Sequence, residues 1–190
     1  QVKDLTFSYN GAPALKNVSF EIPSGQTLAI VGRTGSGKST LVNLLCRLYQ
    51  VPKAGIFIDG NDINDIPLET LRSHIGYVPQ ETFLFSETVQ QNIAFGRPEA
   101  SPQSIQESAK ISNIWPDIQE FPRRFETFVG ERGVTLSGGQ KQRIAISRAL
   151  LVNPKILILD DAFSIVDTDT EERILQGLSG EFSNRTVLLI

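Results

Sequence analysis

The chain has 190 residues, 40% of them apolar, which fits about one domain with a sizeable core and excludes a disordered tail. Its 18 basic and 21 acidic residues leave a net charge of −3 without any basic block, so the charge gives no indication of nucleic-acid binding. No apolar run reaches the roughly 20 residues that cross a bilayer, and the single cysteine excludes an internal disulfide and fits a reducing compartment.

The sequence itself indicates a fragment. It contains no methionine and ends within an apolar run at residues 186–190, so we expect the natural protein to continue at both ends. It has no internal repeat, low-complexity tract or signal peptide.

The first sixty residues are predicted to form strands and turns. Residues 18–22 alternate between apolar and polar side chains, residues 23–25 form a turn, and residues 55–60 are a short strand bounded by glycines. Residues 27–31 form a continuous apolar run, which is typical of a strand buried on both faces.

A glycine-rich turn and a helix follow that run. The helix is predicted from leucines at helical spacing, namely Leu41, Leu44, Leu45 and Leu48. Further buried strands are predicted at residues 75–78, 156–159 and 186–190. Alternation of strands and helices favours a mostly parallel sheet covered by helices. The stretch from about 83 to 152 has no comparable strand and is predicted to be an inserted helical lobe.

The strongest motif is GRTGSGKS at residues 32–39, which has the pattern G-x-x-x-x-G-K-[ST] between a strand and a helix. In such a loop, backbone amides surround phosphate oxygens and the helix N-terminus adds positive potential. Lys38 can reach the β- and γ-phosphates, and the Ser39 hydroxyl is placed to ligate Mg²⁺. A glycine turn that only joins strand to helix is the weaker alternative, because the required context is present.

A second motif is the apolar strand at 156–159 that ends in Asp160. A carboxylate in this position lies at the carboxyl edge of a parallel sheet, where ligands of α/β proteins bind. There Asp160 can hold Mg²⁺ through water, together with Ser39. Taken alone, Asp160 would more simply start a turn or cap a helix.

A third motif is LSGGQ at residues 136–140, followed by a helix predicted to carry Ile144, Ala145, Ala149 and Leu151 on one side. It opens a second helix with a serine and two glycines, an arrangement suited to an anion. It has no lysine and lies in the helical lobe, so we do not expect it to complete the phosphate site of its own chain. Taken alone, an N-cap with a glycine spacer would be the preferred interpretation.

The three motifs, in this order, resemble those of the nucleotide-binding domain of ATP-binding cassette (ABC) proteins over nearly the whole chain. The resemblance implies an α/β fold: a P-loop NTPase (RecA-like) core, an antiparallel β lobe and an inserted helical lobe carrying the LSGGQ signature. It implies one domain, with core and β lobe at about 1–82 and 153–190 and the helical lobe at about 83–152. Two such domains are expected to pair head to tail, each ATP lying between one P-loop and the other chain's signature.

The resemblance also assigns the nucleotide contacts. Tyr9 matches the aromatic residue that stacks on adenine. The phosphate contacts are expected from Gly32, Arg33, Thr34, Gly35, Ser36, Gly37, Lys38, Ser39 and Thr40. The ATP of the facing subunit is expected at Ser137, Gly138, Gly139 and Gln140.

The same resemblance implies the catalytic and metal-binding roles. Gln80 matches the glutamine whose amide touches Mg²⁺ and the attacking water, so the expected metal ligands are Ser39, Gln80 and Asp160. Asp161, Gln80 and Lys38 are the expected catalytic residues. Asp167 matches the loop that reaches across the dimer, although the preceding Ile-Val pair is bulkier than usual.

Other segments resemble the exporter branch, which implies a transmembrane partner and a place on the cytoplasmic face of a membrane. They are residues 81–86, residues 92–93 and the segment from Thr127 to Gly133. Phe83, Leu84 and Phe85 are a candidate docking patch for the transmembrane domain; the alternative is that they belong to the core of the helical lobe.

Two departures from the family pattern qualify this interpretation. Asp161 stands where the family has a glutamate, which suggests a slow site in one subunit of a heterodimeric exporter. The histidine that normally follows the last strand does not occur, because the sequence ends at Ile190.

Three other residues are not assigned a chemical role. His74 is interpreted as a surface or helix-end residue, Cys46 as a packed residue and Trp115 as a loop residue.

Two rival functions stay open at this stage. One is a soluble ABC ATPase that acts on nucleic acid or ribosomes, which the acidic balance and the exporter-like segments disfavour. The other is a nucleotide-binding half-site with little hydrolysis of its own.

Overall fold

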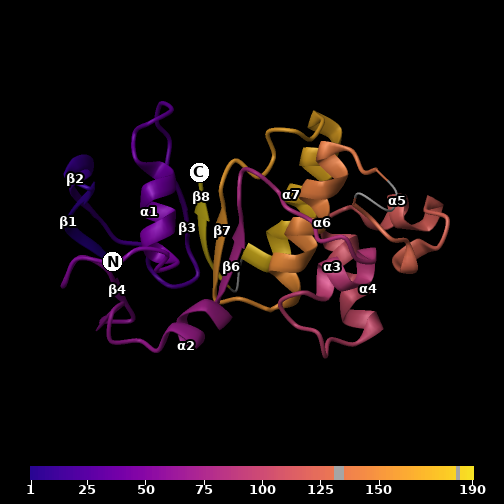
Figure 1. Cartoon of the computed structure of the whole chain (residues 1–190), viewed down its shortest axis with the longest axis horizontal. Coiled ribbons are helices and arrows are strands. Elements are labelled where there is room, and N and C mark those ends of the chain that lie inside the picture. Colours follow the sequence, from indigo (N-terminus) through magenta and orange to yellow (C-terminus); the bar gives the residue numbers. More distant parts are fainter. Residues whose placement is uncertain (131–134, 183–184) are drawn as a thin grey trace.

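The computed structural model of the chain describes residues 1–130, 135–182 and 185–190. At one end lies an antiparallel pair of strands, β1 (Val2–Tyr9) and β2 (Ala12–Phe20) (Figure 1). The register of this pair shifts at several points between Val2 and Ser8, so the ribbon is irregular. It is the antiparallel β lobe expected near the N-terminus.

The centre of the fold is a parallel sheet of four strands in the order β3-β8-β7-β6. The strands are β3 (Thr27–Ala29), β6 (Ile75–Val78), β7 (Ile156–Leu159) and β8 (Thr186–Leu189). Strands β6 and β7 have their predicted bounds, and β8 begins as predicted. Strand β7 is largely buried as expected, whereas β6 is buried only at Gly76 and Val78. Because all four strands are parallel, their carboxyl ends meet at one edge of the sheet.

Short elements connect the β lobe to this sheet. Helix α1 (Lys38–Leu45) follows β3, and β4 (Phe57–Ile58) pairs with β5 (Asn61–Asp62) in a small hairpin. Helix α2 (Leu68–Ser73) then leads into β6. The strand predicted at 55–60 is thus only two residues long.

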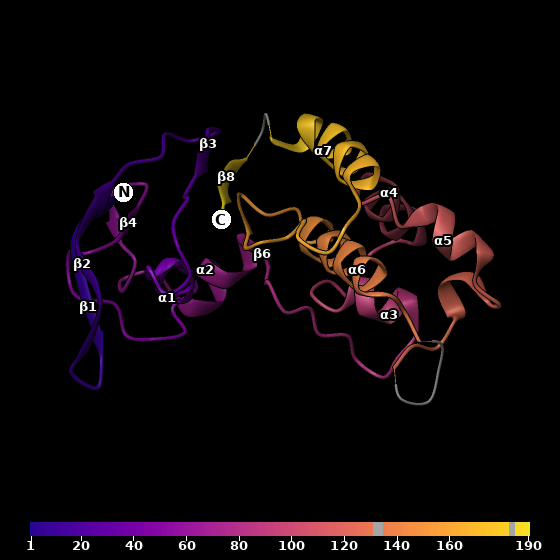
Figure 2. The same cartoon turned by 90° about the horizontal axis from the view of Figure 1, so that it is seen from above.

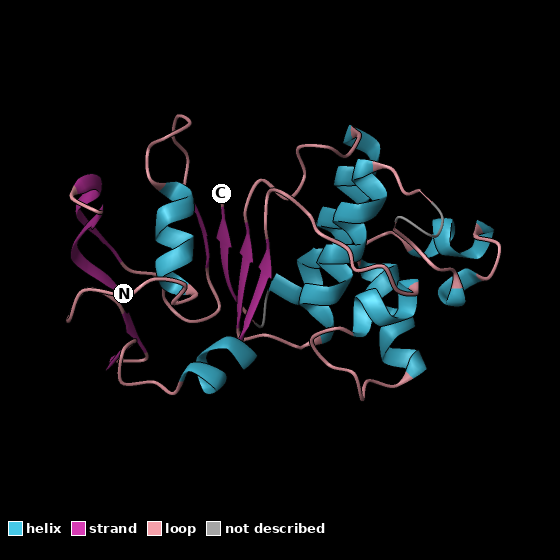
Figure 3. Cartoon of the chain, in the orientation of Figure 1, coloured by secondary structure: helices cyan, strands magenta, loops and turns pink. Residues whose placement is uncertain are grey.

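The remaining helices lie on the other side of the sheet, away from the β lobe (Figure 2). Between β6 and β7 the chain forms α3 (Val89–Ala94), α4 (Pro102–Ile111), α5 (Trp115–Glu120), the 3₁₀ helix η1 (Arg124–Glu126) and α6 (Gly138–Leu151). Helix α7 (Thr168–Phe182) follows β7. Figure 3 shows this division into a strand-rich part and a helical part. In the described ranges, no helix is long and apolar enough to cross a bilayer.

Helix α6 joins the helical lobe to the sheet. Its Ile144 and Leu151 pack into the cluster formed with α3, α4 and α5, whereas Ala145, Ile146 and Ala149 pack with the sheet and α7. The prediction of one apolar side was therefore too narrow, since α6 is covered by neighbours on two sides.

Three local predictions were wrong. The strand predicted at 27–31 is not buried on both faces: β3 is an edge strand of three residues, and Val31 lies beyond its end with 92% of its surface exposed. Leu48 is 53% exposed because α1 ends at Leu45, before Arg47 takes up a left-handed conformation. Trp115 is the first residue of α5, and its ring lies 5.7 Å from that of Phe125.

Candidate functional site

A pocket of about 640 Å³ lies at the carboxyl edge of the sheet. Pro13 and Ala14 of β2 line it on one side, and Gln80, Asp160 and Asp161 line it on another. The loop contributes Gly32, Thr34, Gly35, Gly37, Lys38, Ser39 and Thr40. The fold thus brings most of the predicted phosphate, metal and catalytic residues to one place. Arg33 and Ser36 do not line the pocket; they close the loop through a 3.1 Å hydrogen bond from the Ser36 amide to the Arg33 carbonyl.

The loop is shaped by its glycines and its lysine. Gly37 precedes α1 at a φ of 93°, and a Cβ there would lie 2.6 Å from the carbonyl oxygen of Ala14, so only glycine fits. Lys38 Nζ donates hydrogen bonds to the carbonyls of Gly32 at 2.8 Å and Arg33 at 3.2 Å. The ammonium group therefore lies across the mouth of the loop, where it can meet an incoming phosphate.

Asp160, the residue that follows β7, is a buried acid with 5% of its surface exposed. Burial raises the pKa of its carboxyl, and the neighbouring charge of Asp161 raises it further, while a hydrogen bond from Tyr77 and the charge of Lys38 oppose the shift. The Tyr77 hydroxyl lies 3.4 Å from Asp160 Oδ2. A poorly solvated carboxylate of this kind gains from a cation placed next to it.

Asp161 is held from several directions. Its Oδ2 accepts a 2.9 Å hydrogen bond from Gln80 Nε2, and the amide oxygen of Gln80 has no hydrogen-bond partner among the described residues. Its backbone has a φ of 49°, in the left-handed region. Its carbonyl oxygen accepts hydrogen bonds from Gln142 Nε2 at 3.2 Å and from Ser164 Oγ at 3.0 Å.

Sequence reasoning missed Gln142. The signal that could have found it is a polar residue on a buried stripe, because Gln142 is in helical register with Ala145 and Ala149 and all three are buried.

The donor set of the pocket suits Mg²⁺ that arrives with a nucleotide. Across residues 1–130, 135–182 and 185–190, no group of three or more His, Cys, Asp or Glu side chains could hold a metal by itself. Mg²⁺ needs fewer protein ligands, because it is bound through one or two carboxylates together with phosphates and water. The Ser39 hydroxyl, the Gln80 amide oxygen and the Asp160 carboxylate all supply oxygen and all line the same pocket, so they fit this ion.

The signature segment lies at the start of α6, and none of its residues lines the loop pocket. Ser137 caps the helix, and the Ser137 and Gln140 side chains accept hydrogen bonds from each other's backbone amides at 3.2 and 3.0 Å. Gln140 Nε2 also donates to Asp117 Oδ1 at 2.8 Å. Asp117 in turn forms a 2.7 Å ion pair with Arg143 one turn further along α6.

The loop before α7 touches the signature within the same chain. A Cβ on Gly138 would lie 3.5 Å from Ile165, and one on Gly139 would lie 3.3 Å from the Ile165 carbonyl oxygen. Asp167 Oδ1 accepts a 2.9 Å hydrogen bond from the Thr170 amide, which lowers the pKa of Asp167. Asp167 thus helps to start α7, while its expected contact across a dimer stays a prediction.

Tyr9 lies outside the loop pocket. Its ring packs edge-on against Phe7 and Tyr49, with centroids 5.0 Å away in each case, and it does not line the pocket. Tyr9 pairs with Ala12 across the β hairpin, so it is close in the strand to Pro13, which does line the pocket.

The candidate docking patch divides into exposed and packed residues. Phe83 is 66% exposed, whereas Leu84 packs against the core of the helical lobe. Phe85 stacks on Phe95 at 4.2 Å, and Arg148 lies 5.6 Å from the Phe85 ring. The exposed aromatic surface is therefore formed by Phe83 and by Phe95, which is 58% exposed and which sequence reasoning did not include.

The second segment expected to contact a transmembrane partner, residues 127–133, is described only as far as Gly130. Thr127 and Val129 are buried, and Phe128 is 38% exposed. Residues 131–133 lie outside the described residues.

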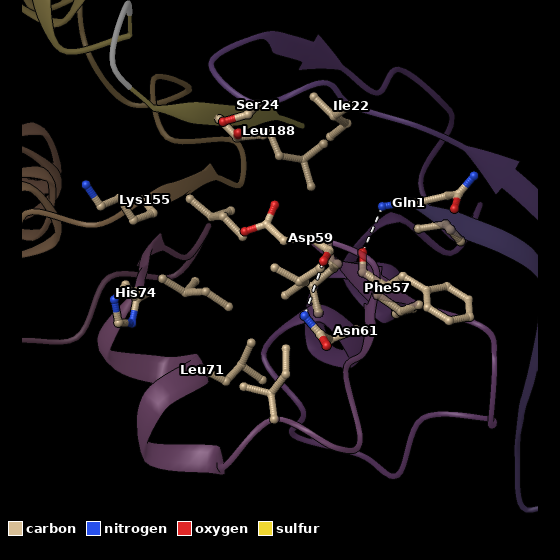
Figure 4. A pocket seen from close by; sticks show the side chains of 18 of the residues that line it. Gln1, Ile22, Ser24, Phe57, Asp59, Asn61, Leu71, His74, Lys155 and Leu188 are labelled. Carbon is tan, nitrogen blue, oxygen red and sulfur yellow. Dashed lines mark hydrogen bonds between the residues drawn. The ribbon is translucent and has the colours of Figure 1, made fainter.

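The residues expected to have no chemical role lie away from the loop pocket. Cys46 is buried, which raises the pKa of its thiol to about 11. His74 caps the C-terminus of α2. His74 and Lys155 line a second, largely apolar pocket of about 440 Å³ between the β lobe and the sheet (Figure 4). None of the predicted site residues lines this second pocket.

Comparison with known proteins gives a consistent result. A family profile described as "ABC transporter" matches residues 15–164. "Heavy metal tolerance factor 1" of Caenorhabditis elegans is 48% identical over the whole chain, and "ATP-dependent lipid A-core flippase" of Photobacterium profundum is 45% identical, also over the whole chain.

A solved structure is also similar to the chain over its full length. The chain aligns over its full length with a bacterial Atm1-family ABC exporter with ATP bound, at a TM-score of 0.95 and 43% identity. The chain spans 24% of the worm relative, 33% of the flippase and 34% of the exporter chain, so it matches only a part of each.

Proposed function

Because the chain belongs to the ABC transporter family, we propose that it binds and hydrolyses ATP to drive export across a membrane, as the nucleotide-binding domain of an exporter. The observation that carries this proposal is the pocket that gathers Lys38, Ser39, Gln80, Asp160 and Asp161 at the carboxyl edge of the sheet. Similarity to an exporter and to a flippase supports export over a soluble ATPase that acts on nucleic acid or ribosomes.

In this proposal the residues of the pocket have distinct roles. Lys38 and the loop amides hold the phosphates of ATP and offset the negative charge that develops during phosphoryl transfer. Ser39, Asp160 and the Gln80 amide oxygen would hold Mg²⁺, which when bound neutralises charge on the phosphate oxygens. Asp161 and Gln80, joined by their hydrogen bond, orient the attacking water.

The signature is proposed to serve the ATP of a facing nucleotide-binding domain in a head-to-tail dimer. Two observations support this: residues Ser137 to Gln140 open a helix, whose N-terminus favours an anion, and they do not line their own chain's pocket. Tyr9 is proposed to stack on adenine after the β lobe adjusts to the nucleotide.

The partner that couples this domain to transport is proposed to be a transmembrane domain. Phe83, extended by the exposed ring of Phe95, and the segment 127–133 are the proposed contacts. In that arrangement the chain lies on the cytoplasmic face of the membrane. The division into core and β lobe at about 1–82 and 153–190 and helical lobe at about 83–152 stays a prediction.

A second candidate is a half-site with little hydrolysis of its own, in a heterodimeric exporter. Asp161 favours it, because its side chain is one methylene shorter than the glutamate of the family and is already hydrogen-bonded to Gln80. A displacement of about 1 Å can lower a rate by on the order of 10²-fold.

The direct experiment measures Mg²⁺-dependent ATP hydrolysis by the full-length protein reconstituted in lipid vesicles. We expect phosphate release that requires Mg²⁺ and that is lost in Asp160→Asn. Hydrolysis that persists undiminished after chelation of Mg²⁺ would contradict the proposed roles of Ser39, Gln80 and Asp160.

A further inference from the structure

Gln142 is a polar residue in a position that packing alone would give to an apolar one. It is the fifth residue of α6, and its side chain is fully buried, with 0% of its surface exposed. Its Nε2 donates to the carbonyl oxygen of Asp161 at 3.2 Å, but its Oε1 has no hydrogen-bond partner within the described part of the chain.

This arrangement is unfavourable for stability. A buried amide oxygen without a partner carries its full desolvation penalty. Leucine or methionine fills a similar volume without that penalty. Core packing therefore does not explain a glutamine at this position. The feature that an apolar residue could not supply is the side-chain hydrogen bond from Gln142 to Asp161.

The acceptor of that hydrogen bond is the backbone carbonyl of Asp161, the residue proposed to orient the attacking water. Asp161 has a φ of 49°, a conformation that is uncommon for residues other than glycine and persists where the surroundings fix it. Its carbonyl accepts hydrogen bonds from Gln142 Nε2, from Ser164 Oγ and, at 3.3 Å, from the Ser164 amide, and its own amide donates to the Ile190 carbonyl at 2.9 Å. This backbone carries the Asp161 carboxylate, which accepts the 2.9 Å hydrogen bond from Gln80 Nε2.

We propose that Gln142 is a positioning residue for Asp161: the hydrogen bond from its amide to the Asp161 carbonyl holds the backbone that aims the carboxylate at the attacking water. The inference rests on the proposed ATP hydrolysis, and it assigns Gln142 no contact with the nucleotide.

The test compares Gln142→Leu with the wild-type full-length protein in steady-state ATP hydrolysis. Loss of the hydrogen bond should lower kcat by roughly 10- to 100-fold, because catalysis is sensitive to displacements of about 1 Å. KM for ATP should stay within about twofold, because Gln142 does not line the pocket. The melting temperature should be unchanged or higher, because the unpaired amide oxygen is removed. The matched control is Gln176→Leu, which replaces an exposed glutamine on α7 whose side chain donates a hydrogen bond to Glu172, and it should behave as wild type.

A second variant distinguishes positioning from a merely structural role. In Gln142→Glu, the ionised carboxylate faces the Asp161 carbonyl without a proton to donate, whereas the protonated form can make the hydrogen bond. Burial raises the pKa of such a glutamate. Relative to wild type at each pH, kcat of Gln142→Glu should therefore be lowest at high pH and should recover as the pH falls. If Gln142→Leu does not fold, kcat of Gln142→Met and the pH profile of Gln142→Glu test the positioning role instead.

The outcomes separate the two proposals. A wild type that hydrolyses ATP no faster than Lys38→Ala overturns the proposed function and this inference together. Two results would overturn only the positioning role, provided that the wild type hydrolyses ATP. One is an unchanged kcat in folded Gln142→Leu. The other is a ratio of kcat in Gln142→Glu to kcat in the wild type that does not change with pH.

Discussion

The side-chain amide of Gln80 donates a 2.9 Å hydrogen bond to the carboxylate of Asp161, across 81 positions of sequence. The two residues follow β6 and β7, which are neighbours in the parallel sheet. Because parallel neighbours end at the same edge, the fold places two side chains that the sequence separates widely around one point. The contact fixes Asp161 while leaving the Gln80 amide oxygen available.

Replacement of Lys38 by alanine should abolish ATP binding or hydrolysis. The phosphates lose their point positive charge, and the carbonyls of Gly32 and Arg33 lose the ammonium group that now bridges them. Titration with a fluorescent ATP analogue measures binding, and phosphate release measures turnover. Lys155→Ala, a substitution outside the loop pocket, is the control and should bind ATP normally. Unchanged binding and turnover in Lys38→Ala would contradict the assignment of the loop.

The buried carboxyl of Asp160 should make stability depend on pH in a defined direction. Because the pKa of Asp160 is raised in the folded state, mainly by burial, its favourable contribution is fully present below the pKa of the unfolded chain and is lost as the pH rises through the folded value. Asp160→Asn should therefore unfold at a higher temperature than wild type at neutral pH.

That difference should shrink toward about pH 4, near the ordinary pKa of aspartate. Thermal unfolding from pH 4 to 8 without nucleotide provides the measurement. Addition of ATP with Mg²⁺ should stabilise the wild type more than Asp160→Asn, because the variant lacks the proposed ligand charge. An Asp160→Asn protein that is less stable than wild type at neutral pH would contradict the sign of the effect.

How far the sequence predicts this fold depends on how local each signal is. The strand at 156–159 was predicted at its observed bounds from an uninterrupted apolar run, which is a local sign of burial in a parallel sheet. The strand at 75–78 also has its predicted bounds, although its apolar residues are interrupted by a glycine and only Gly76 and Val78 are buried. The run at 27–31 has the same pattern, but its strand β3 lies at one edge of the sheet. Strand β6 lies at the other edge, and both edge strands are less buried than β7 in the interior. Strand order is a long-range property that no window of sequence contains.

The candidate site divides in the same way. The loop at 32–39 is a contiguous motif, so its residues were recognised directly, and the structure gathers most of them in one pocket. The hydrogen bonds of Gln142 to Asp161 and of Gln140 to Asp117 join residues 19 and 23 positions apart, from different elements. Such contacts depend on how helices pack against the sheet, and no spacing rule predicts them.

The signature should act on the facing site rather than on its own. A Cβ on Gly138 would lie at an ordinary contact distance of 3.5 Å from Ile165, so Gly138→Ala should fold normally, whereas a bulky residue such as leucine must displace Ile165 or project from the helix start. Gly138→Leu should leave this chain's ATP binding unchanged and block ATP-driven dimerisation and hydrolysis at the partner site.

Light scattering with and without ATP measures the dimerisation, and nucleotide titration of the isolated variant measures binding. Gly138→Ala is the matched control, since it adds one methyl group without forcing a rearrangement. Loss of ATP binding by a folded Gly138→Leu domain would contradict the arrangement in trans.

The last prediction concerns Asp161 and the identity of the second subunit. A carboxylate one methylene shorter than glutamate should orient water poorly, with a cost on the order of 10²-fold in rate. The intact signature is proposed to serve the opposite site. In a heterodimer, Asp161→Glu should therefore leave turnover intact or raise it, and replacement of the partner's catalytic glutamate by glutamine should nearly abolish it. The substitution should also lower stability by about 1 kcal/mol, because the φ of 49° is tolerated better by aspartate than by glutamate.

Phosphate release by full-length dimers that carry one substitution at a time provides the measurement, and thermal unfolding separates the backbone strain from the change in rate. An asymmetric result, with little effect of Asp161→Glu and a large effect of the partner's substitution, identifies this chain's pocket as the slow site. If the chain alone forms a homodimer that turns over at the rate of an exporter with glutamate at this position, Asp161 orients water adequately and the heterodimer hypothesis is wrong. In that case the hydrogen bond from Gln80 would be the feature that compensates for the shorter side chain, and Gln80→Ala should lower kcat in the homodimer.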